Sequence, residues 1–290
     1  MLLDIHEPGE TPLPHDQERG IAVGIDLGTT NSVVAVSRDN DPHALRDLKG
    51  RAMIPSVVAY GAGEPVVGEA ARALLLERPQ AVVSSIKRLM GRGAADLKAL
   101  SGALPYEVVP GSTDGMVQLK VEGQVLSPVE ISAEILRACK ARAEAALGQS
   151  VDQAVITVPA YFDDAARTAT RDAARLAGLL VLRLVNEPTA AALAYGLDKG
   201  AEGIYAIYDL GGGTFDFSLL RLEKGVFQVL ATGGDAALGG DDFDHAIAEG
   251  FLSERRKAGL PASPNSDSAK LVLATARLAK EHLSNNDDGE

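Results

Sequence analysis

Two short turns that combine aspartate, glycine and threonine are the residues of this sequence best suited to chemistry. The first is Asp-Leu-Gly-Thr-Thr-Asn at 26–31, and the second is Asp-Leu-Gly-Gly-Gly-Thr at 209–214. Glycine lets backbone N–H groups approach an anion, threonine hydroxyls add donors, and an aspartate at a strand end can hold a hydrated cation. Two such turns facing each other would hold one magnesium-bound nucleotide.

A single turn of this kind more often only connects two strands, but a second copy in the same context favours a shared function. The chain contains neither a G-x-x-x-x-G-K-[ST] loop nor a G-x-G-x-x-G run between a strand and a helix. Since these are the common nucleotide-binding loops, the phosphate site predicted here is of another type.

The residues around each turn predict a β-hairpin with the glycines at its tip. Apolar runs at 21–25 and 204–208 lead into the two aspartates, and β-rich stretches follow at 32–36 and 215–222. Strand, tight glycine turn and strand is the usual pattern of a hairpin. The two hairpins therefore begin two lobes of similar design.

A long helix is predicted at 129–147. Ser127 and Glu130 form a capping box around Pro128, and Gly148 supplies the stop.

Strands at 153–158 and 180–185 then flank a second helix, which Asp163 or Asp164 begins and Gly178 ends. Alternating strands and helices predict an α/β fold with a largely parallel sheet covered by helices.

After residue 204 the order restarts with the second hairpin, a strand at 226–231 and helices from Phe243 and at 271–283. We therefore expect a flexible arm at 1–19, a first lobe at 20–203 with an inserted subdomain at about 57–126, and a second lobe at 204–290.

The composition excludes several classes of protein. With 290 residues, 46% hydrophobic content and a net charge of −12, the chain is typical of a globular protein without a basic nucleic-acid-binding face. No apolar run approaches the roughly 18 residues that span a bilayer, so no membrane insertion is expected. Cys139 is the single cysteine, which excludes an intrachain disulfide, favours a buried packing role and indicates a cytoplasmic protein. The five histidines are scattered, and none is predicted to bind metal.

Glu187 is the best candidate for a further charged group in the site. It lies in Asn-Glu-Pro-Thr at 186–189, where a strand meets a helix and ligands of open α/β folds collect. The alternative is a carboxylate that only stabilises the helix start. Lys87, by contrast, has no feature that physical reasoning from sequence would select.

Four longer motifs resemble the ATPase domain of the 70-kDa heat-shock chaperones. They are GIDLGTTNS at 24–32, VITVPAYF at 155–162, NEPTAAALAYG at 186–196 and DLGGGTFD at 209–216. The resemblance runs from about residue 20 to the C-terminus. The arm IHEPGETPLPH at 5–15, KRLMGR at 87–92 and VLATGGDAALGGDDFD at 229–244 are most similar to bacterial members that serve iron–sulfur cluster assembly.

The resemblance implies an actin-like, ribonuclease H-like fold of two lobes that binds ATP or ADP with Mg²⁺, and with K⁺ as an additional ion. It implies an ATPase that transfers the terminal phosphoryl group to water. The implied catalytic residues are Lys87, Glu187, Asp209 and Thr214, and the implied ligands of magnesium-bound water are Asp26, Asp209 and Asp216. The implied nucleotide-binding residues are Gly28, Thr29, Thr30, Asn31, Gly211, Gly212, Gly213, Thr214, Lys280 and Ser284. Pro159 and Arg167 match the family's interlobe switch.

The sequence departs from the family at two places. Arg277 stands where the family's adenine-contacting helix carries glutamate. The chain also ends at Glu290, before the family's second glycine-rich adenosine loop and peptide-binding domain. We therefore expect an incomplete second lobe with uncovered apolar faces and a tendency to self-associate.

The resemblance implies a J-domain co-chaperone as partner, and iron–sulfur scaffold or unfolded peptide clients that bind through the absent C-terminal domain. Neither nucleic acid nor a membrane is an expected partner. Three alternatives stay open: a general chaperone of the same family, a sugar or acetate kinase of the same fold, and an inactive fragment that acts as an interaction module.

Overall fold

The computed structural model describes residues 21–39, 41–93, 96–99, 106–109, 116–195, 202–235, 238–262, 266–284 and 286. The arm predicted at 1–19 lies outside these residues.

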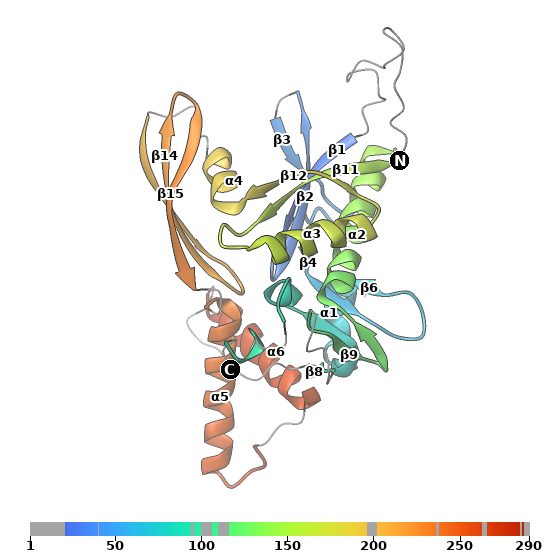
Figure 1. Cartoon of the computed structure of the whole chain (residues 1–290). Helices are drawn as coiled ribbons and strands as arrows, with labels where there is room; N and C mark the ends of the chain where they lie inside the picture. The colour runs from blue at the N-terminus through green and yellow to red at the C-terminus, as the bar shows by residue number, and fades with distance from the viewer. Residues whose placement is uncertain are drawn as a thin grey trace.

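A mixed sheet forms the centre of the first lobe, with the strand order β12-β11-β1-β2-β3 and with β4 paired to β2 (Figure 1). β1 runs parallel to β11 and β11 parallel to β12, whereas β2 and β3 return antiparallel. The strand bounds are β1 Ile21–Leu27, β2 Asn31–Arg38, β3 Asp41–Ala44, β4 Ile54–Pro55, β11 Val151–Val158 and β12 Leu180–Asn186.

Helices α2 (Pro128–Leu147) and α3 (Asp164–Leu176) lie side by side against this sheet (Figure 1). Both begin as their sequences predict, because Ser127 and Glu130 cap each other's backbone N–H groups and the Asp163 carboxylate accepts from Ala166 N at 2.8 Å. Their apolar faces and the inward side chains of β1 form one core, in which Cys139 is fully buried. Its complete burial in this core confirms the predicted packing role of Cys139, and that burial raises the pKa of the thiol to about 12.

The chain between β4 and α2 forms two small sheets and several short helices. The first sheet contains β5 Val57–Ala59, β6 Val66–Val67 and β7 Val82–Ser84, and the second contains β8 Glu107–Val108, β9 Leu119–Val121 and β10 Gln124–Leu126. The helices are α1 Glu69–Leu74 and the 3₁₀ turns η1 Pro79–Ala81, η2 Ile86–Leu89 and η3 Asp96–Ala99. The turn η2 carries Lys87.

The second hairpin continues into a three-stranded antiparallel sheet of β13 Gly203–Leu210, β14 Phe215–Glu223 and β15 Val226–Asp235. α4 (Glu187–Ala194) precedes this sheet, and α5 (Gly240–Lys257) and α6 (Ser266–Leu283) follow it and pack on each other. α6 also contacts η1 of the first lobe. Both predicted hairpins are thus confirmed, whereas α5 begins three residues before the predicted Phe243.

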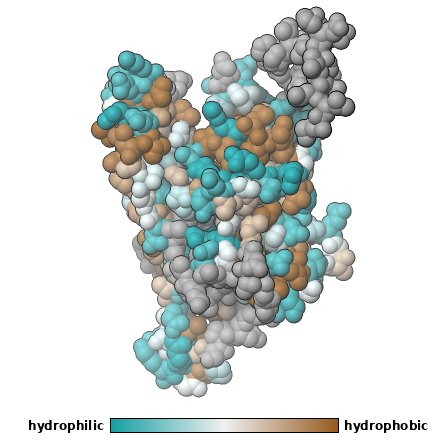
Figure 2. Space-filling view, viewed as in Figure 1, coloured by the Kyte–Doolittle hydropathy of each residue, from teal (hydrophilic) through white to brown (hydrophobic). Residues whose placement is uncertain are grey.

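One face of the second sheet is exposed and apolar. Ile204, Tyr208 and Leu210 alternate along β13 and are 62%, 67% and 43% exposed, and Phe217, opposite Tyr208, lies on the same face. Figure 2 shows hydrophobic surface gathered over β14 and β15. The expected uncovered apolar face is therefore present in the second lobe.

The described part of the chain contains no helix that combines the length and hydrophobicity needed to span a membrane.

Candidate functional site

The tips of the two hairpins touch each other. A Cβ atom added to Gly212 would lie 1.8 Å from Thr30 Oγ1, and one added to Gly213 would lie 2.7 Å from Thr29 Cγ2. Real Cβ atoms do not approach other atoms this closely, so only glycine allows the second turn to pack on the threonines of the first. The two turns predicted to face each other are brought together.

The first turn is held by its own lobe. Gly28 packs so tightly that an added Cβ would lie 2.1 Å from Asn31 O. Ser56 N donates to Thr30 O at 2.8 Å, and Ser56 Oγ donates to Gly28 O at 2.8 Å. The buried Ser32 Oγ lies 2.9 Å from Ser56 Oγ and completes this small network. Buried hydroxyls therefore fix the shape of the first turn.

The second turn is held by the start of α5. Gly211 N donates to Thr214 O at 2.9 Å and closes the turn. Gly240 N then donates to Gly211 O at 3.0 Å, and Asp241 N donates to Gly212 O at 2.7 Å. These amides belong to the first turn of α5 and have no partner within the helix, so the carbonyls of the glycine turn accept them. The same contacts explain why α5 starts at Gly240.

Three aspartates lie in β1, β13 and β14, near the strand ends that lead to the hairpin tips. Asp26 Oδ1 accepts a 2.7 Å hydrogen bond from Thr157 Oγ1, and Asp209 lies directly opposite Asp216 in the β13–β14 pairing. Burial raises the pKa of Asp216, and the negative charge of Asp209 adds to this rise. Two carboxylates that face each other in this way concentrate negative charge and favour a bound cation.

Lys87 and Glu187 form a buried ion pair beside the tips. Lys87 Nζ donates to Glu187 Oε1 at 2.6 Å, and the two side chains are only 10% and 15% exposed. Burial raises the pKa of Glu187, Lys87 opposes that rise, and the charges of Asp26 and Asp209 add to it. The negative charges of carboxylates from both lobes therefore act on Glu187, as expected of a residue at the junction of the lobes.

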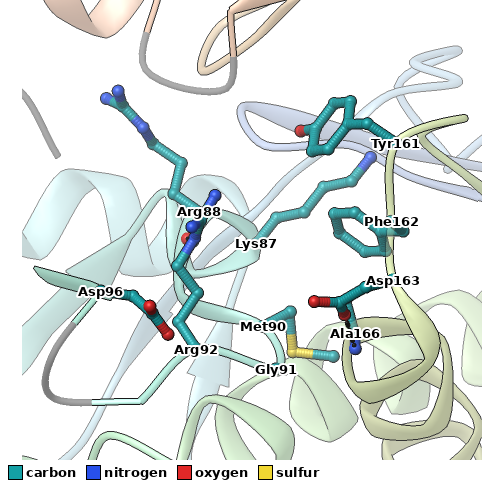
Figure 3. Close-up of a pocket in the computed structure, with 10 residues that line it drawn as sticks. All are labelled: Lys87, Arg88, Met90, Gly91, Arg92, Asp96, Tyr161, Phe162, Asp163 and Ala166. Atoms are coloured by element: carbon teal, nitrogen blue, oxygen red, sulfur yellow. Dashed lines mark hydrogen bonds between the residues drawn. The ribbon is translucent and has the colours of Figure 1, made fainter. Parts of the chain in front are cut away.

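A cavity of about 210 Å³ lies on one side of Lys87 (Figure 3). Its walls come from η2, the residues that follow η2, and the loop between β11 and α3, and they include Lys87, Arg92, Tyr161 and Phe162. Burial raises the pKa of the Tyr161 hydroxyl, and the nearby charge of Asp216 adds to this effect. The cavity therefore adjoins the place where the two lobes meet.

Pro159 and Arg167 are linked through the loop that follows β11. Pro159 is buried, and its carbonyl accepts from Phe162 N at 3.2 Å. Arg167 Nε donates to Phe162 O at 2.8 Å, and Arg167 Nη2 donates to Asn186 Oδ1 at 2.9 Å. Arg167 thus connects this loop to the residue before Glu187.

The residues at the positions of the family's adenosine-contacting helix, of which Lys280 and Ser284 are predicted contacts, are engaged elsewhere. Arg277 forms ion pairs with Asp241 and Asp244. Lys280 Nζ pairs with Asp244 at 2.5 Å and donates to Gly240 O at 2.7 Å, close to the second turn. The Ser284 hydroxyl donates to the carbonyl of Lys280, one helical turn earlier, and lies at the surface. The structure therefore brings Lys280 near the second turn but does not direct Ser284 to the hairpin tips.

Sequence reasoning did not select Ser56, Thr157 or Arg88, which all contact the site. Ser56 and Thr157 are ordinary hydroxyl residues in or beside strands, and no local pattern distinguishes them. Arg88 directly follows Lys87 but acts on residues 154 positions further along the chain. Only the folded chain reveals these contacts.

The chemistry of the three aspartates fits magnesium held through water. Mg²⁺ prefers oxygen ligands and keeps several of its own waters, so it needs few carboxylates at a distance. In the described ranges, no group of three histidine, cysteine, aspartate or glutamate side chains could hold a metal ion by itself. Asp26, Asp209 and Asp216 are accordingly candidates for contacts to metal-bound water.

Comparison with known proteins identifies the class to which this arrangement belongs. The family model described as "Hsp70 protein" matches residues 22–290. The chain therefore belongs to the Hsp70 family, and the first lobe and paired hairpins are those of its actin-like, two-lobed ATPase domain.

Curated relatives named "Chaperone protein HscA homolog" are closely similar. The protein from Pseudomonas aeruginosa strain PAO1 is 60% identical over 282 residues, which cover 97% of this chain and 45% of that protein. The protein from Azotobacter vinelandii is 57% identical over 98% of this chain and 45% of its own length. The chain thus spans less than half the length of these relatives.

Proposed function

We propose that this chain is the ATP-binding and ATP-hydrolysing domain of an Hsp70-type chaperone. The observation that carries the proposal is the buried Lys87–Glu187 pair beside two glycine turns that touch across the lobes. Phosphoryl transfer needs positioning and charge neutralisation more than covalent chemistry, and this arrangement supplies both.

The roles follow from the contacts. Backbone N–H groups and hydroxyls of 28–31 and 211–214 would bind the phosphates from opposite sides. Lys87 would neutralise charge on the terminal phosphate and orient the attacking water, while Glu187 holds the lysine in place through their 2.6 Å hydrogen bond. Asp209 and Thr214, at the end and tip of the second hairpin, would complete the site from the second lobe.

Magnesium, with its water held by Asp26, Asp209 and Asp216, would neutralise phosphate charge when bound. The buried position of Asp216 and its pairing with Asp209 support this assignment. Lys280 would contact the nucleoside only after exchanging its present contact with Gly240 O, and Ser284 would have to turn from its own helix. We include K⁺ in this proposal as an additional ion that binds together with the magnesium-bound nucleotide.

The proposal also covers the role of this ATPase domain in a longer chaperone like the HscA homologues. Pro159 and Arg167 would report nucleotide binding between lobes, because Arg167 joins the loop after β11 to Asn186. The similarity to HscA homologues supports a role in iron–sulfur cluster assembly, with a J-domain co-chaperone and a cluster scaffold or unfolded client as partners. A cytoplasmic location, expected from the sequence, is part of this proposal.

Calorimetric titration of the 290-residue chain with Mg-ADP, followed by single-turnover hydrolysis of ATP, tests the proposal. We expect magnesium-dependent ADP binding and slow release of phosphate with water as the acceptor. A titration without magnesium serves as the control for the metal.

Two results would favour the alternatives. Turnover that requires a sugar or acetate would indicate a kinase of the same fold. A folded chain that binds neither ADP nor ATP would indicate an interaction module, and the ATPase proposal would be wrong for this chain.

A further inference from the structure

Arg88 follows the proposed catalytic lysine but points away from it. Figure 3 shows Lys87 extending toward Tyr161 and Arg88 extending to the opposite side. Both side chains leave the same short turn, η2. A force that moves Arg88 therefore moves the backbone that carries Lys87.

The aliphatic part of Arg88 packs on the second phosphate turn. A Cβ atom added to Gly213 would lie 3.0 Å from Arg88 Cγ and 3.1 Å from Arg88 Cδ. Gly213 is thus enclosed by Thr29 and Arg88, both from the first lobe. The position of the glycine turn depends on the arginine stem as well as on the opposing hairpin tip.

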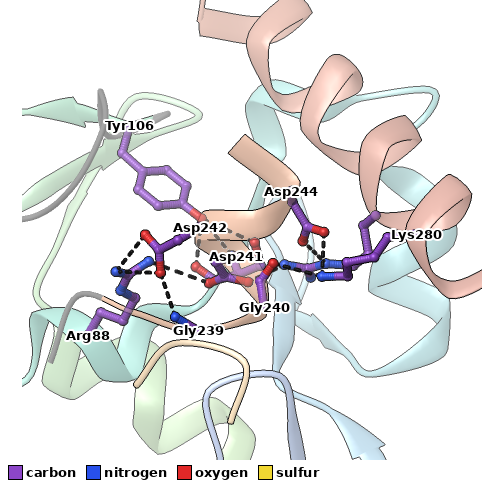
Figure 4. Close-up of polar contacts among 10 residues, drawn as sticks. Arg88, Tyr106, Gly239, Gly240, Asp241, Asp242, Asp244 and Lys280 are labelled. Atoms are coloured by element: carbon purple, nitrogen blue, oxygen red, sulfur yellow. Dashed lines mark hydrogen bonds and ion pairs between the residues drawn. The ribbon is translucent and has the colours of Figure 1, made fainter. Parts of the chain in front are cut away.

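The guanidinium of Arg88 reaches the first turn of α5 (Figure 4). Arg88 Nη2 donates to Asp242 Oδ1 at 3.2 Å and to Oδ2 at 3.3 Å, and Nη1 lies 3.9 Å from Asp241 Oδ2. The three side chains are 10%, 13% and 9% exposed. Ion pairs at this burial are little screened by water, and loss of one partner leaves the other charge uncompensated.

The carboxylates that bind Arg88 belong to the segment that holds the second turn. Asp242 Oδ2 accepts from Gly239 N at 2.8 Å, and the amides of Gly240 and Asp241 hold the carbonyls of Gly211 and Gly212. Arg277 and Lys280 bind Asp241 and Asp244 from within the second lobe. Arg88 differs from these two cations because it binds the segment from the first lobe.

We propose that Arg88 is a positioning residue that fixes the second phosphate turn relative to Lys87. This inference rests on the proposed ATPase function of the same site. Through its stem on Gly213 and its ion pairs to Asp241 and Asp242, Arg88 holds the lobe-two turn at the correct distance from the lysine. Arg88 does not itself contact the reacting atoms.

The test compares Arg88→Met, which keeps the stem but removes the charge, with Arg88→Lys, which keeps the charge. A displacement of about 1 Å in such a site can lower a rate about 100-fold. We expect Arg88→Met to slow single-turnover hydrolysis about 10- to 100-fold while Mg-ADP affinity falls less than about threefold. Arg88→Lys should recover part of the rate.

Asp242→Asn tests the partner. If Arg88 acts through Asp242, the double variant Arg88→Met/Asp242→Asn should hydrolyse ATP about as slowly as Arg88→Met alone, because removing either partner breaks the same contact. Losses that multiply would mean that the two residues act separately and would overturn the proposal.

Lys270→Met is the matched control, because Lys270 also joins the lobes but donates its hydrogen bonds to η1 and β7 instead of to the segment that holds the second turn. Its Nζ donates to Pro79 O at 2.9 Å and to Val82 O at 3.1 Å. This variant should lower thermal stability and leave the hydrolysis rate within about threefold of the unmodified chain. Equal rate losses in Lys270→Met and Arg88→Met would overturn a specific positioning role.

Amide hydrogen exchange separates this inference from the proposed function. In Arg88→Met, the amides of Gly211, Gly240 and Asp241 should exchange faster than in the unmodified chain, whether or not ATP is hydrolysed. Faster exchange in a chain that lacks ATPase activity would support the positioning role and disprove only the ATPase. Unchanged exchange would overturn the positioning role.

Discussion

The two glycine turns have similar sequences but are held in place by different means. The turn at 28–31 is fixed within the first lobe, where the buried Ser56 binds the carbonyl of Gly28. The turn at 211–214 is held by the backbone of α5 and by Arg88, which comes from the other lobe. Both turns are thus held within their own lobes, and the second depends in addition on how the lobes meet.

This difference suggests a division of labour. A preformed turn can bind phosphate without waiting for a change elsewhere, since its hydrogen bonds are already made. A turn that depends on the opposite lobe is correctly placed only when the lobes approach each other. We therefore expect changes in the first turn to affect mainly stability, and changes in the second to affect mainly nucleotide binding or hydrolysis.

The largest expected effect comes from Lys87→Ala and Thr214→Ala, which remove one group from each lobe. Each should slow single-turnover hydrolysis about 100-fold, since loss of one preorganised electrostatic contact typically costs 10²–10³-fold. ADP affinity should change much less, because both groups are assigned to the terminal phosphate and water. Equal losses of ADP binding and hydrolysis would show that these roles are wrong.

Glycine substitutions should separate the two turns. In Gly28→Ala, the new Cβ would meet the backbone oxygen of Asn31, and the free energy of unfolding should fall by about 3 kcal/mol. In Gly213→Ala, the new Cβ would meet Thr29 and Arg88 across the lobes. We therefore expect a lower nucleotide affinity, and a smaller loss in the free energy of unfolding than in Gly28→Ala. Denaturant unfolding and calorimetry measure both.

Gly211→Ala is the stability control, because its Cβ would lie at an ordinary 3.5 Å from Thr214 O. If Gly213→Ala destabilises the chain as strongly as Gly28→Ala, the two turns do not differ in the way described.

The hydroxyl network gives a smaller effect confined to the first turn. Ser56→Ala should lower the free energy of unfolding by about 1–3 kcal/mol, because the fully buried Ser32 hydroxyl loses its partner. Adding Ser32→Ala to the Ser56→Ala variant should lower the free energy of unfolding by less than Ser32→Ala does in the unmodified chain. In the double variant no buried hydroxyl of this pair remains unpaired. Strict additivity in denaturant unfolding would exclude the coupling.

Glu187 should make the free energy of unfolding depend on pH, by about 1.4 kcal/mol for each unit by which its pKa is raised. Burial raises this pKa above its ordinary value of 4.5. Between 4.5 and the raised pKa, the unfolded chain ionises Glu187 more readily than the folded chain, so stability is lost as pH rises through that range.

Urea unfolding of the unmodified chain and Glu187→Gln across this pH range measures the difference. As pH rises, the free energy of unfolding of the unmodified chain should fall relative to that of Glu187→Gln. The opposite slope would mean that the attraction of Lys87 outweighs the cost of burying the carboxylate.

The smallest expected effect concerns the sheets that carry the turns. The exposed apolar face of β13 should promote weak self-association, visible as concentration-dependent sedimentation. Ile204→Thr/Tyr208→Thr should reduce it, whereas Leu48→Thr, at an exposed site in the first lobe, should not. A monomer at all concentrations would contradict the expectation.

The local features of the fold were predictable from the sequence because their causes are local. The capping box at Ser127 and Glu130 and the cap at Asp163 lie within one helical turn of the groups they satisfy. The two hairpins follow from apolar runs on either side of glycine turns. The start of α5 was predicted three residues late, because amides at Gly240 and Asp241 bind another element rather than their own helix.

The sequence alone determined the α/β organisation, both glycine turns, their aspartates and, through the family motifs, the candidates Lys87 and Glu187. Only the tertiary structure decided how these groups are held: Ser56 against the first turn, and Arg88 against Gly213 and Asp242. The tertiary structure also decided that Lys280 donates to Gly240 O and forms an ion pair with Asp244. The physical reason is distance along the chain, because hydrogen bonds and ion pairs between remote residues leave no periodic or local signature in the sequence.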